Sequence, residues 1–245
     1  MYKRQPIPPT SSLGAGRPGE PTPYDPETVK SSEVGVKWTA PNGRFRLNVA
    51  AYKAEYQGLQ FPVFFPGTTT IYTSNASDGE VSGVELEPTW QVSDALQVYG
   101  NGSYTTGKYT KDWFCNDQFN VLKNCGLGEI PGQIPEKLTL GFRFSPELPF
   151  PGSISMNGSW VYNTAYFNNV ANEGPLVQAM PAGIFNLSVN WSSEDDRYSA
   201  TLDARNLADK HVVWSGLQSG HPTSPSVTGY VNNPREIVFR VGMKF

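Results

Sequence analysis

Residues that carry catalysis or bind metal ions are scarce in this sequence. Its 245 residues include two histidines and two cysteines, and 17% of the side chains are charged. Neither a phosphate-binding loop nor a nucleophile elbow is present. Glu85 and Glu87 share a face, but paired carboxylates without evidence of a cleft do not make a hydrolytic site. We therefore predict that the protein is not an enzyme and holds no cofactor or metal ion. A net charge of −3 gives no indication of a nucleic-acid partner.

Long hydrophobic runs are also missing, since no apolar stretch approaches the roughly 18 residues of a membrane-spanning helix. A chain of this kind can still enter a membrane as strands, because a transmembrane strand alternates apolar and polar residues. The composition favours strands and loops, with 24 glycines, 21 prolines and 13% aromatic residues. No segment shows a helical period.

Alternation is clearest in the terminal segment 237–245. Its odd positions are all large and apolar: Ile237, Phe239, Val241, Met243 and Phe245. A strand with this pattern has one apolar face and one polar face. Taken alone, the segment favours a strand in a soluble core over one in an outer-membrane barrel, and the rest of the chain reverses that preference.

Eight further segments alternate in the same way, and the connections between them follow a regular order. Tight turns are predicted near 41–43, 93–94, 146–152 and 194–196, and they alternate with longer loops. Short turns at one end and long loops at the other are typical of an outer-membrane barrel. We therefore predict an all-β fold, an antiparallel transmembrane β-barrel of the up-and-down type, represented by about nine strands. The third strand, about 69–92, is predicted to be interrupted near 75–79.

Aromatic residues on the apolar faces cluster near the tight turns and the C-terminus. They are Trp38, Phe45, Trp90, Phe144, Trp191, Tyr198 and Phe245. This clustering predicts an interfacial ring at one edge of the bilayer. The opposite faces carry polar residues that would line a wet lumen: Glu85, Glu87, Gln91, Gln97, Asn101, Arg143, Asn157, Asn186, Asn190, Asp203, Arg205, Arg240 and Lys244.

Four places resemble a known family in order and spacing. They are 26–37, Asn75–Ser77 followed by Val81–Leu86, Asp203–Lys210, and Gly229–Val231 with Pro234, Arg235 and the terminal Phe245. Together they resemble the C-terminal barrel of TonB-dependent outer-membrane receptors over about 26–245. The resemblance implies a plugged barrel of about 22 strands. The chain is then expected to be its C-terminal portion, without the plug and without the box that engages the energy transducer.

The remaining segment, 1–25, is predicted to be an irregular N-terminal stretch, and 1–5 resembles translated adapter sequence. The family resemblance implies a Gram-negative outer-membrane receptor that imports a bulky nutrient with cellular energy, most often a ferric siderophore. Its implied partners are outer-membrane lipid, the nutrient, and a TonB-type energy transducer reached through the missing N-terminal part. A passive diffusion porin is the alternative, and a secreted all-β carbohydrate-binding or hydrolase domain is a third interpretation.

The same resemblance places the C-terminus on the periplasmic side and the long loops outside the cell. Cys115 and Cys125 share one such loop, where we predict a disulfide, with two free thiols or a metal pair as alternatives. The terminal strand is expected to be the signal that the assembly machinery reads, through Phe239, Val241, Met243 and Phe245. Aromatic residues in or beside the loops are candidates for ligand contact, with loop packing as the alternative role: Trp113, Phe114, Tyr166, Phe167 and Trp214.

Overall fold

The computed structural model describes residues 2–3, 24–64, 71–116, 122–126, 128–168, 178–221 and 224–245. Within these ranges, one large antiparallel sheet contains nine long strands and one short strand. In spatial order they are β1 (Tyr2–Lys3), β2 (Thr28–Thr39), β3 (Phe45–Phe64), β4 (Ile71–Gln91), β5 (Leu96–Tyr109), β8 (Glu136–Phe144), β9 (Ser153–Asn163), β12 (Ala182–Ser192), β13 (Tyr198–Arg205) and β16 (Glu236–Met243).

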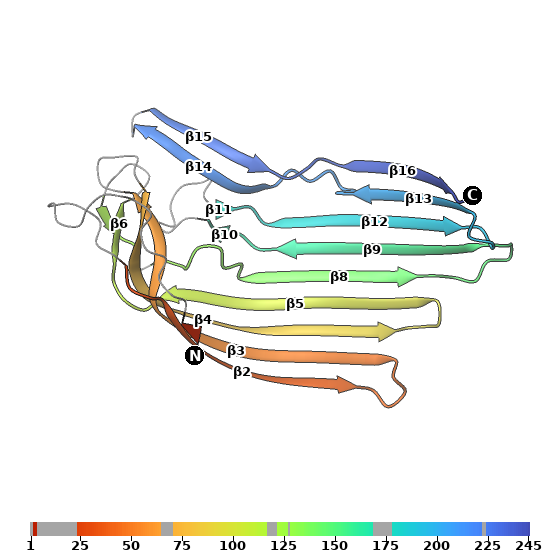
Figure 1. Ribbon diagram of the computed structural model, residues 1–245, viewed down its shortest axis with the longest axis horizontal. Coiled ribbons are helices and arrows are strands. Elements are labelled where there is room, and N and C mark those ends of the chain that lie inside the picture. Colours follow the sequence, from red (N-terminus) through yellow and green to blue (C-terminus); the bar gives the residue numbers. More distant parts are fainter. Residues whose placement is uncertain are drawn as a thin grey trace.

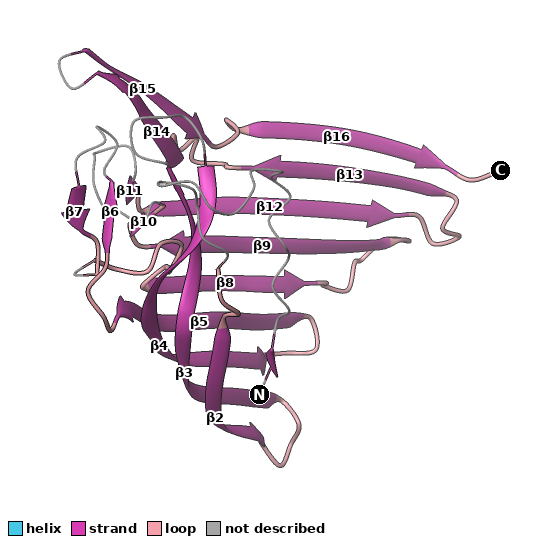
Figure 2. Cartoon of the chain, turned by 60° about the vertical axis from the view of Figure 1, so that its left-hand side comes forward, coloured by secondary structure: helices cyan, strands magenta, loops and turns pink. Residues whose placement is uncertain are grey.

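The long strands lie side by side in chain order, so the sheet is a meander. All the tight turns lie at one end and the long connections at the other, which we call the turn end and the loop end (Figure 1). The sheet curves like part of a barrel wall, but β2 and β16 stay apart (Figure 2). The predicted fold class is therefore confirmed, and the strands of this chain alone form an open sheet.

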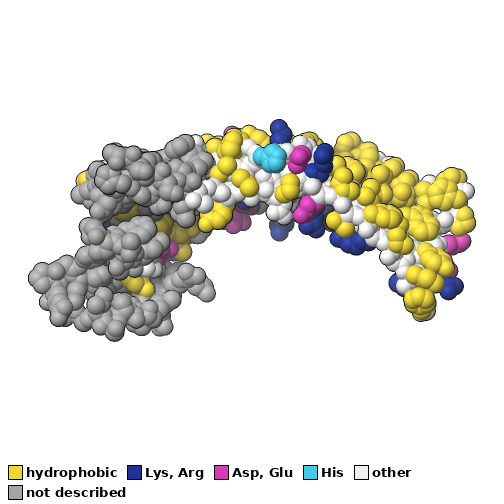
Figure 3. Space-filling model, turned by 90° about the horizontal axis from the view of Figure 1, so that it is seen from above, with side chains coloured by type: hydrophobic (Ala, Val, Ile, Leu, Met, Phe, Trp, Pro, Cys, Tyr) yellow, Lys and Arg dark blue, Asp and Glu magenta, His cyan; other side chains and the backbone are white. Residues whose placement is uncertain are grey.

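The period-two pattern of the sequence places the apolar residues on one face. Across β2, β3 and β4, for example, Val34 lies opposite Ala51, and Ala51 lies opposite Val84. Most of the large apolar side chains on this outward face are solvent-exposed in the isolated chain. Hydrophobic side chains gather over the turn end of the sheet (Figure 3). No helix in the described ranges has the length and hydropathy to cross a membrane.

Two glycines allow tyrosine rings to lie flat across neighbouring strands. Gly83 is paired with Tyr52, and a Cβ atom on Gly83 would lie 2.7 Å from the tyrosine hydroxyl. Gly141 is paired with Tyr99, and a Cβ atom there would lie 2.3 Å from the ring. An aromatic ring over a cross-strand glycine covers backbone that would otherwise be bare, which fixes the register of the pair.

The predicted interruption of the third strand is wrong, because β4 runs without a break from Ile71 to Gln91. The irregularity belongs to its pairing with β3, where the register shifts on either side of Leu59. Gly58 adopts a φ of 66° there, a backbone conformation that suits glycine. Its N–H donates to Asp78 Oδ1 at 3.0 Å and its carbonyl accepts from Asn75 Nδ2 at 2.8 Å. Polar side chains therefore close the bulge without ending the strand.

The long connections contain two-stranded sheets of their own. These pair β6 (Phe114–Asn116) with β7 (Leu122–Asn124), β10 (Tyr166–Phe167) with β11 (Gln178–Ala179), and β14 (Val213–His221) with β15 (Ser224–Val231). The sequence predicted only a loop over 212–234, whereas most of that region is a β-hairpin. Of the predicted irregular segment 1–25, residue 1 and residues 4–23 lie outside the described ranges, so that prediction stays open.

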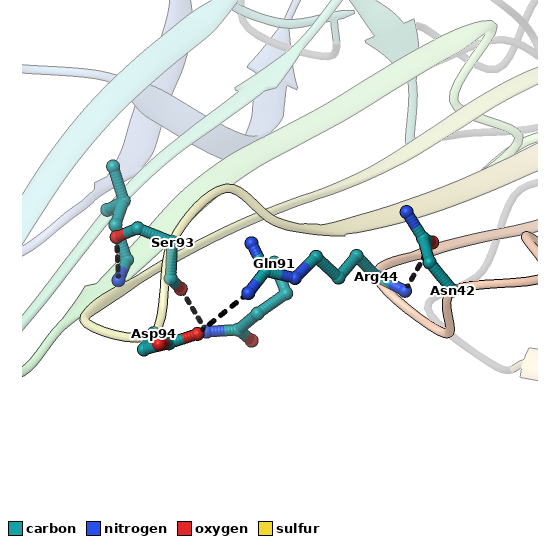
Figure 4. A network of polar contacts seen from close by, with 6 residues as sticks. Asn42, Arg44, Gln91, Ser93 and Asp94 are labelled. Atoms are coloured by element: carbon teal, nitrogen blue, oxygen red, sulfur yellow. Dashed lines mark hydrogen bonds and ion pairs between the residues drawn. The ribbon is translucent and has the colours of Figure 1, made fainter.

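At the turn end, polar side chains join two neighbouring turns (Figure 4). The N–H of Arg44 donates to Asn42 Oδ1 at 3.0 Å, and the Arg44 guanidinium pairs with Asp94 at 2.9 Å. Gln91 Nε2 donates to the Ser93 carbonyl at 2.8 Å. Since Arg44 and Asp94 are largely solvent-exposed, this ion pair contributes at most about 1 kcal/mol and mainly aligns the turns.

Candidate functional site

The polar residues of the predicted lumen lie together on the concave face and bond across strands. Glu87 accepts from Asn48 and from Asn101, both at 3.2 Å. Farther along the sheet, Thr201 donates to Asn190 at 3.0 Å, and Arg240 forms an ion pair with Asp203. These side chains form hydrogen bonds and ion pairs with one another and remain polar at the surface. The concave face can therefore contact water, a polar solute or a polar protein segment.

Two hollows lie over this face. One, of about 440 Å³, lies over β2, β3 and β4, and its charged lining residues are Glu33, Lys37, Glu85 and Glu87. The other, of about 360 Å³, lies over β5, β9, β12 and β13 and is lined by amides, hydroxyls, Tyr99, Asp203 and Arg205. Hydrogen-bonding side chains dominate both linings, which is the chemistry of polar solute contact and offers no nucleophile–base pair for catalysis.

A buried hydrophobic cluster lies at the loop end, and we call it the loop core. It consists of Leu59, Val81, Tyr109, Trp113, Cys125 and Ile130, with Tyr52, Tyr56 and Phe61 packed against it. The ring of Phe61 stacks on Trp113 with centroids 6.2 Å apart, and Tyr109 meets Trp113 edge-on at 5.7 Å. Burial raises the pKa of Tyr109, so its hydroxyl remains protonated. The loop after β5 is therefore packed onto β3, β4 and β5.

Polar bonds hold the same loop in place. Ser77 Oγ donates to the Lys111 carbonyl at 2.8 Å, and Lys111 Nζ pairs with Asp78 at 2.6 Å. Cys125 is 1% exposed and is disulfide-bonded, and its N–H donates to the Trp113 carbonyl at 2.8 Å. The side chain of Cys115, the other cysteine of the sequence, lies outside the described residues, so its predicted pairing with Cys125 stays a prediction.

The five aromatic candidates for ligand contact divide by burial. Trp113 is 7% exposed within the loop core, whereas its neighbour Phe114 is 62% exposed. Tyr166 and Phe167 are half-buried in β10, and Trp214 in β14 is exposed. The geometry thus gives Trp113 the packing role and leaves Phe114 and Trp214 accessible to a solute.

Hydrogen bonds connect the three long loops with one another. Gly132 N–H donates to the Phe167 carbonyl at 2.8 Å, which joins the loop after β5 to β10. Asn168 Nδ2 donates to the Trp214 carbonyl at 2.9 Å, which joins β10 to β14. The structure therefore brings Phe167 and Trp214 into one loop assembly, as expected if the loops form a single binding surface.

The aromatic residues at the turn end behave differently, since they lie on the outward face. Trp38 and Phe45 come within 5.9 Å between ring centroids, and Phe45 is paired with Trp90 on the next strand. Phe245, the terminal residue, is fully exposed. An outward aromatic ring beside an apolar band is the arrangement found at the interface of a membrane barrel.

Sequence reasoning missed what happens to this outward face nearer the loop end. The alternation of β3 loses its apolar character after Ala51, where Lys53 and Glu55 follow in the same outward phase. Lys53 pairs with Glu55 at 3.2 Å and with Glu80 of β4 at 2.9 Å. The side chains of β3 thus keep their two-residue alternation, and only their chemistry changes from apolar to polar. The polar residues at alternating positions were the sequence signal that could have revealed this change.

The sheet is curved and antiparallel, its outward face is apolar and its concave face is polar. Together these features define the wall of an outer-membrane-type barrel. The family model "TonB dependent receptor-like, beta-barrel" matches residues 4–207, and the chain belongs to this family of receptor-like barrels, which are not enzymes. A curated relative from Acinetobacter baumannii, described as probable TonB-dependent siderophore receptor PiuA, is 21% identical over 205 residues. That match covers 81% of this chain and 25% of the relative, so the chain spans about a quarter of the relative's length.

Solved structures show the same fold. The chain is similar to the ferric yersiniabactin uptake receptor FyuA from Yersinia pestis, with a TM-score of 0.72 and 17% identity over 91% of this chain and 31% of that one. It is also similar to the siderophore receptor PiuA from Acinetobacter baumannii, with a TM-score of 0.68 and 19% identity over 91% of this chain and 29% of that one. A third similar structure, the ferric-catecholate import receptor Fiu from E. coli, has a TM-score of 0.66 and 18% identity, covering 96% and 30%.

Proposed function

We propose that the full-length protein is a Gram-negative outer-membrane receptor that imports a bulky nutrient, foremost a ferric siderophore, using energy delivered by a TonB-type transducer. Membership of the barrel family is the observation that carries this proposal. The similarity to PiuA, FyuA and Fiu, which are receptors for siderophores or ferric chelates, favours an iron chelate among the nutrients that such receptors take up. The polar concave face is consistent with passage of a hydrophilic solute.

The burial of each side chain suggests which residues support the loops and which contact the ligand. The loop core holds the loop after β5 in position, and the accessible aromatic side chains, Phe114 and Trp214, contact the ligand. Aromatic rings bind the flat, partly apolar chelating groups of a siderophore through area and stacking. The polar concave face below the loops receives the solute or the protein segment that closes the lumen.

Energy-dependent uptake is the decisive test of this function. Cells that produce the full-length receptor should accumulate radiolabelled ferric siderophore at a rate that saturates with concentration and falls to background when an uncoupler removes the proton-motive force. Cells without the gene are the control. Uptake that persists with the uncoupler and rises linearly with concentration would favour a passive diffusion porin instead.

Binding measurements test the role of the exposed aromatic residues. Replacement of Phe114 or Trp214 by Ala should weaken ferric siderophore binding roughly tenfold, which is the typical cost of losing an aromatic contact. Phe150→Ala is a matched control, because Phe150 is also exposed but lies in a tight turn at the opposite end of the sheet. A control that weakens binding as much as the loop variants would argue against this placement of the ligand.

A further inference from the structure

At the loop end, β3, β4 and β5 continue past the end of β8. β5 is paired with β8 only as far as Tyr104, opposite Glu136, where β8 begins. Residues 105–109 of β5 remain paired with 79–83 of β4, and that part of β4 remains paired with 52–56 of β3. We call this part of the three strands the extension. Figures 1 and 2 show β3 and β4 bending sharply at this end of the sheet.

The two faces of the extension have the reverse polarity of the rest of the sheet. Its outward face carries Lys53, Glu55 and Glu80, and Lys53 pairs with the two glutamates at 3.2 and 2.9 Å. On its other face Ala54 lies opposite Val81, and both side chains are buried. The period of two makes that face continuous with the concave face of the sheet. Because apolar side chains are buried there, protein covers the concave side of the extension.

The loop between β5 and β8 provides this cover. Its Trp113 is buried within the loop core. The side chain of Ile130 lies over Gly79 of β4, where an added Cβ atom would be 2.9 Å from Ile130 Cδ1. Gln133 lies over Gly107 of β5 in the same way, with its Cγ atom 2.7 Å from an added Cβ. The described part of this loop therefore lies on the lumen side of the wall.

Several kinds of contact hold the loop in that place. Besides the loop core, Lys111 pairs with Asp78 at 2.6 Å and Cys125 is disulfide-bonded. The described parts of the other two long loops contain no comparable hydrophobic cluster, and the hydrogen bond from Asn168 to the Trp214 carbonyl links them. Opening the loop after β5 would expose a buried tryptophan, so this loop should open far less often than the other two.

We propose that the loop after β5 is a fixed inner wall of the entrance, which narrows the path over β3–β5 and thereby sets the largest solute that reaches the concave face. A layer packed on a sheet takes up roughly 10 Å of width. The hollow over β5, β9, β12 and β13, lined by Tyr99, Asn186 and Asp203 among others, stays open. A bulky solute therefore enters along that side. The inference rests on the proposed transport function and adds solute size as the property that this loop selects.

The test measures how fast reagents of different size reach cysteines introduced into the full-length receptor on intact cells. Ser103→Cys lies on the concave face of β5, directly below the extension. Val161→Cys lies on the concave face of β9, one row deeper and on the other side of the entrance, where Val161 is exposed. The reagents are a small maleimide dye and the same maleimide on a polyethylene glycol of several nanometres. The receptor without an introduced cysteine gives the background.

Size should matter at one position only. The small dye should label both cysteines. The large reagent, relative to the small dye, should label Ser103→Cys roughly tenfold more slowly than Val161→Cys, because it must wait for the loop to open. Adding Trp113→Ala should remove most of this difference by loosening the loop core, with no change at Val161→Cys.

Two further variants support the interpretation. Ile130→Ala removes a smaller part of the loop core and should act in the same direction as Trp113→Ala with a weaker effect. Phe150→Ala, in a tight turn at the other end of the sheet, should change neither rate. Heat-modifiable migration verifies that each variant is folded, and Ile130→Ala keeps the test open if Trp113→Ala does not fold.

Three results would overturn the proposal. The first is equal relative labelling of the two cysteines in the wild-type background, and the second is a size difference that loosening the loop core leaves unchanged. The third is a cysteine at either position that neither reagent labels, since another part of the receptor would then cover that side. Labelling needs neither a ligand nor the energy transducer. A negative result thus leaves the transport function untouched, and failed uptake leaves the labelling result standing.

Discussion

Aromatic side chains gather at both ends of the sheet, yet the two ends use them in opposite ways. At the turn end Trp90 is 49% exposed on the outward face and is paired with Phe45, whose ring also meets that of Trp38. At the loop end Trp113 is 7% exposed and stacks within the loop core. A tryptophan side chain is thus exposed on the outward face at the turn end and buried against other side chains at the loop end.

The difference shows where each end obtains its stability. The loop end has a packed hydrophobic cluster, a disulfide and an internal ion pair, so it is stabilised as a small soluble protein would be. The turn end has tight turns but an outward face that none of the described residues covers. On our account lipid covers it, so removal of a side chain should have a large effect on folding at the loop end and a small one at the turn end.

The largest effect is predicted for Trp113→Ala. Loss of a buried tryptophan should destabilise the loop core by about 3–5 kcal/mol, and the loop after β5 should lose protection from amide hydrogen exchange and from protease. The exposed neighbour provides the control, since Phe114→Ala should change the same protection by less than about 0.5 kcal/mol. Equal protection in the two variants would mean that the loop core does not hold the loop.

A somewhat smaller effect is predicted for Cys125→Ser. If Cys125 is bonded to Cys115 as predicted, loss of the disulfide costs about 2–4 kcal/mol, so protease should cut the loop near β6 and β7 faster while the rest of the sheet stays intact. Reductant applied to the wild-type protein should reproduce the result. Cleavage that is the same with and without reductant would contradict a stabilising role for the bond.

At the turn end, deletion of Phe245 should act on assembly and not on stability. The fully exposed ring makes few contacts within the chain, so unfolding free energy should change by less than about 0.5 kcal/mol. If the terminal strand is the assembly signal, the amount of folded receptor in the outer membrane should fall, while siderophore affinity per folded molecule stays the same. Normal abundance after the deletion would remove the proposed signal.

The smallest effect concerns the ion pair of the loop end. The hydrogen bond from Lys111, followed by that from the Gly58 N–H, lowers the pKa of Asp78 below its ordinary 3.8. The contribution of this ion pair to the free energy of unfolding is therefore fully present above the ordinary pKa of Asp78, and it is lost as pH falls through the lower folded-state pKa. Since Lys111 is exposed, this contribution amounts to about 0.5 kcal/mol. Exchange protection of the loop should drop slightly on acidification, and Asp78→Asn should remove that step.

The strands could be predicted from sequence because their pattern is local. A period of two fixes which face each residue occupies, and this pattern located the strands, the tight turns and both faces. The terminal strand illustrates it, with Phe239 and Val241 outward and Arg240 paired to Asp203 on the concave face. The break expected near 75–79 was wrong because a bulge in β3 absorbs the irregularity opposite it.

The loop core could not be predicted, because its members come together only in the folded sheet. Phe61, Tyr109 and Trp113 lie on different elements, and no sequence period relates them. The charged group of Lys53, Glu55 and Glu80 on the outward face was missed for a different reason. Lys53 and Glu55 kept the outward phase of β3, but their polarity looked like a loss of alternation until the register with Glu80 placed them on one surface.

The assignment of the two faces is best tested along β4, with a spin label introduced at single positions of the full-length receptor reconstituted in lipid. Labels at Val84 and Leu86 should collide with oxygen dissolved in the bilayer, and labels at Glu85 and Glu87 should collide with a water-soluble nickel reagent. At Glu80, where the outward face becomes polar toward the loop end, the label should become accessible to the aqueous reagent. Equal accessibility to the nickel reagent at 84, 85, 86 and 87 would contradict a lipid-facing outward surface.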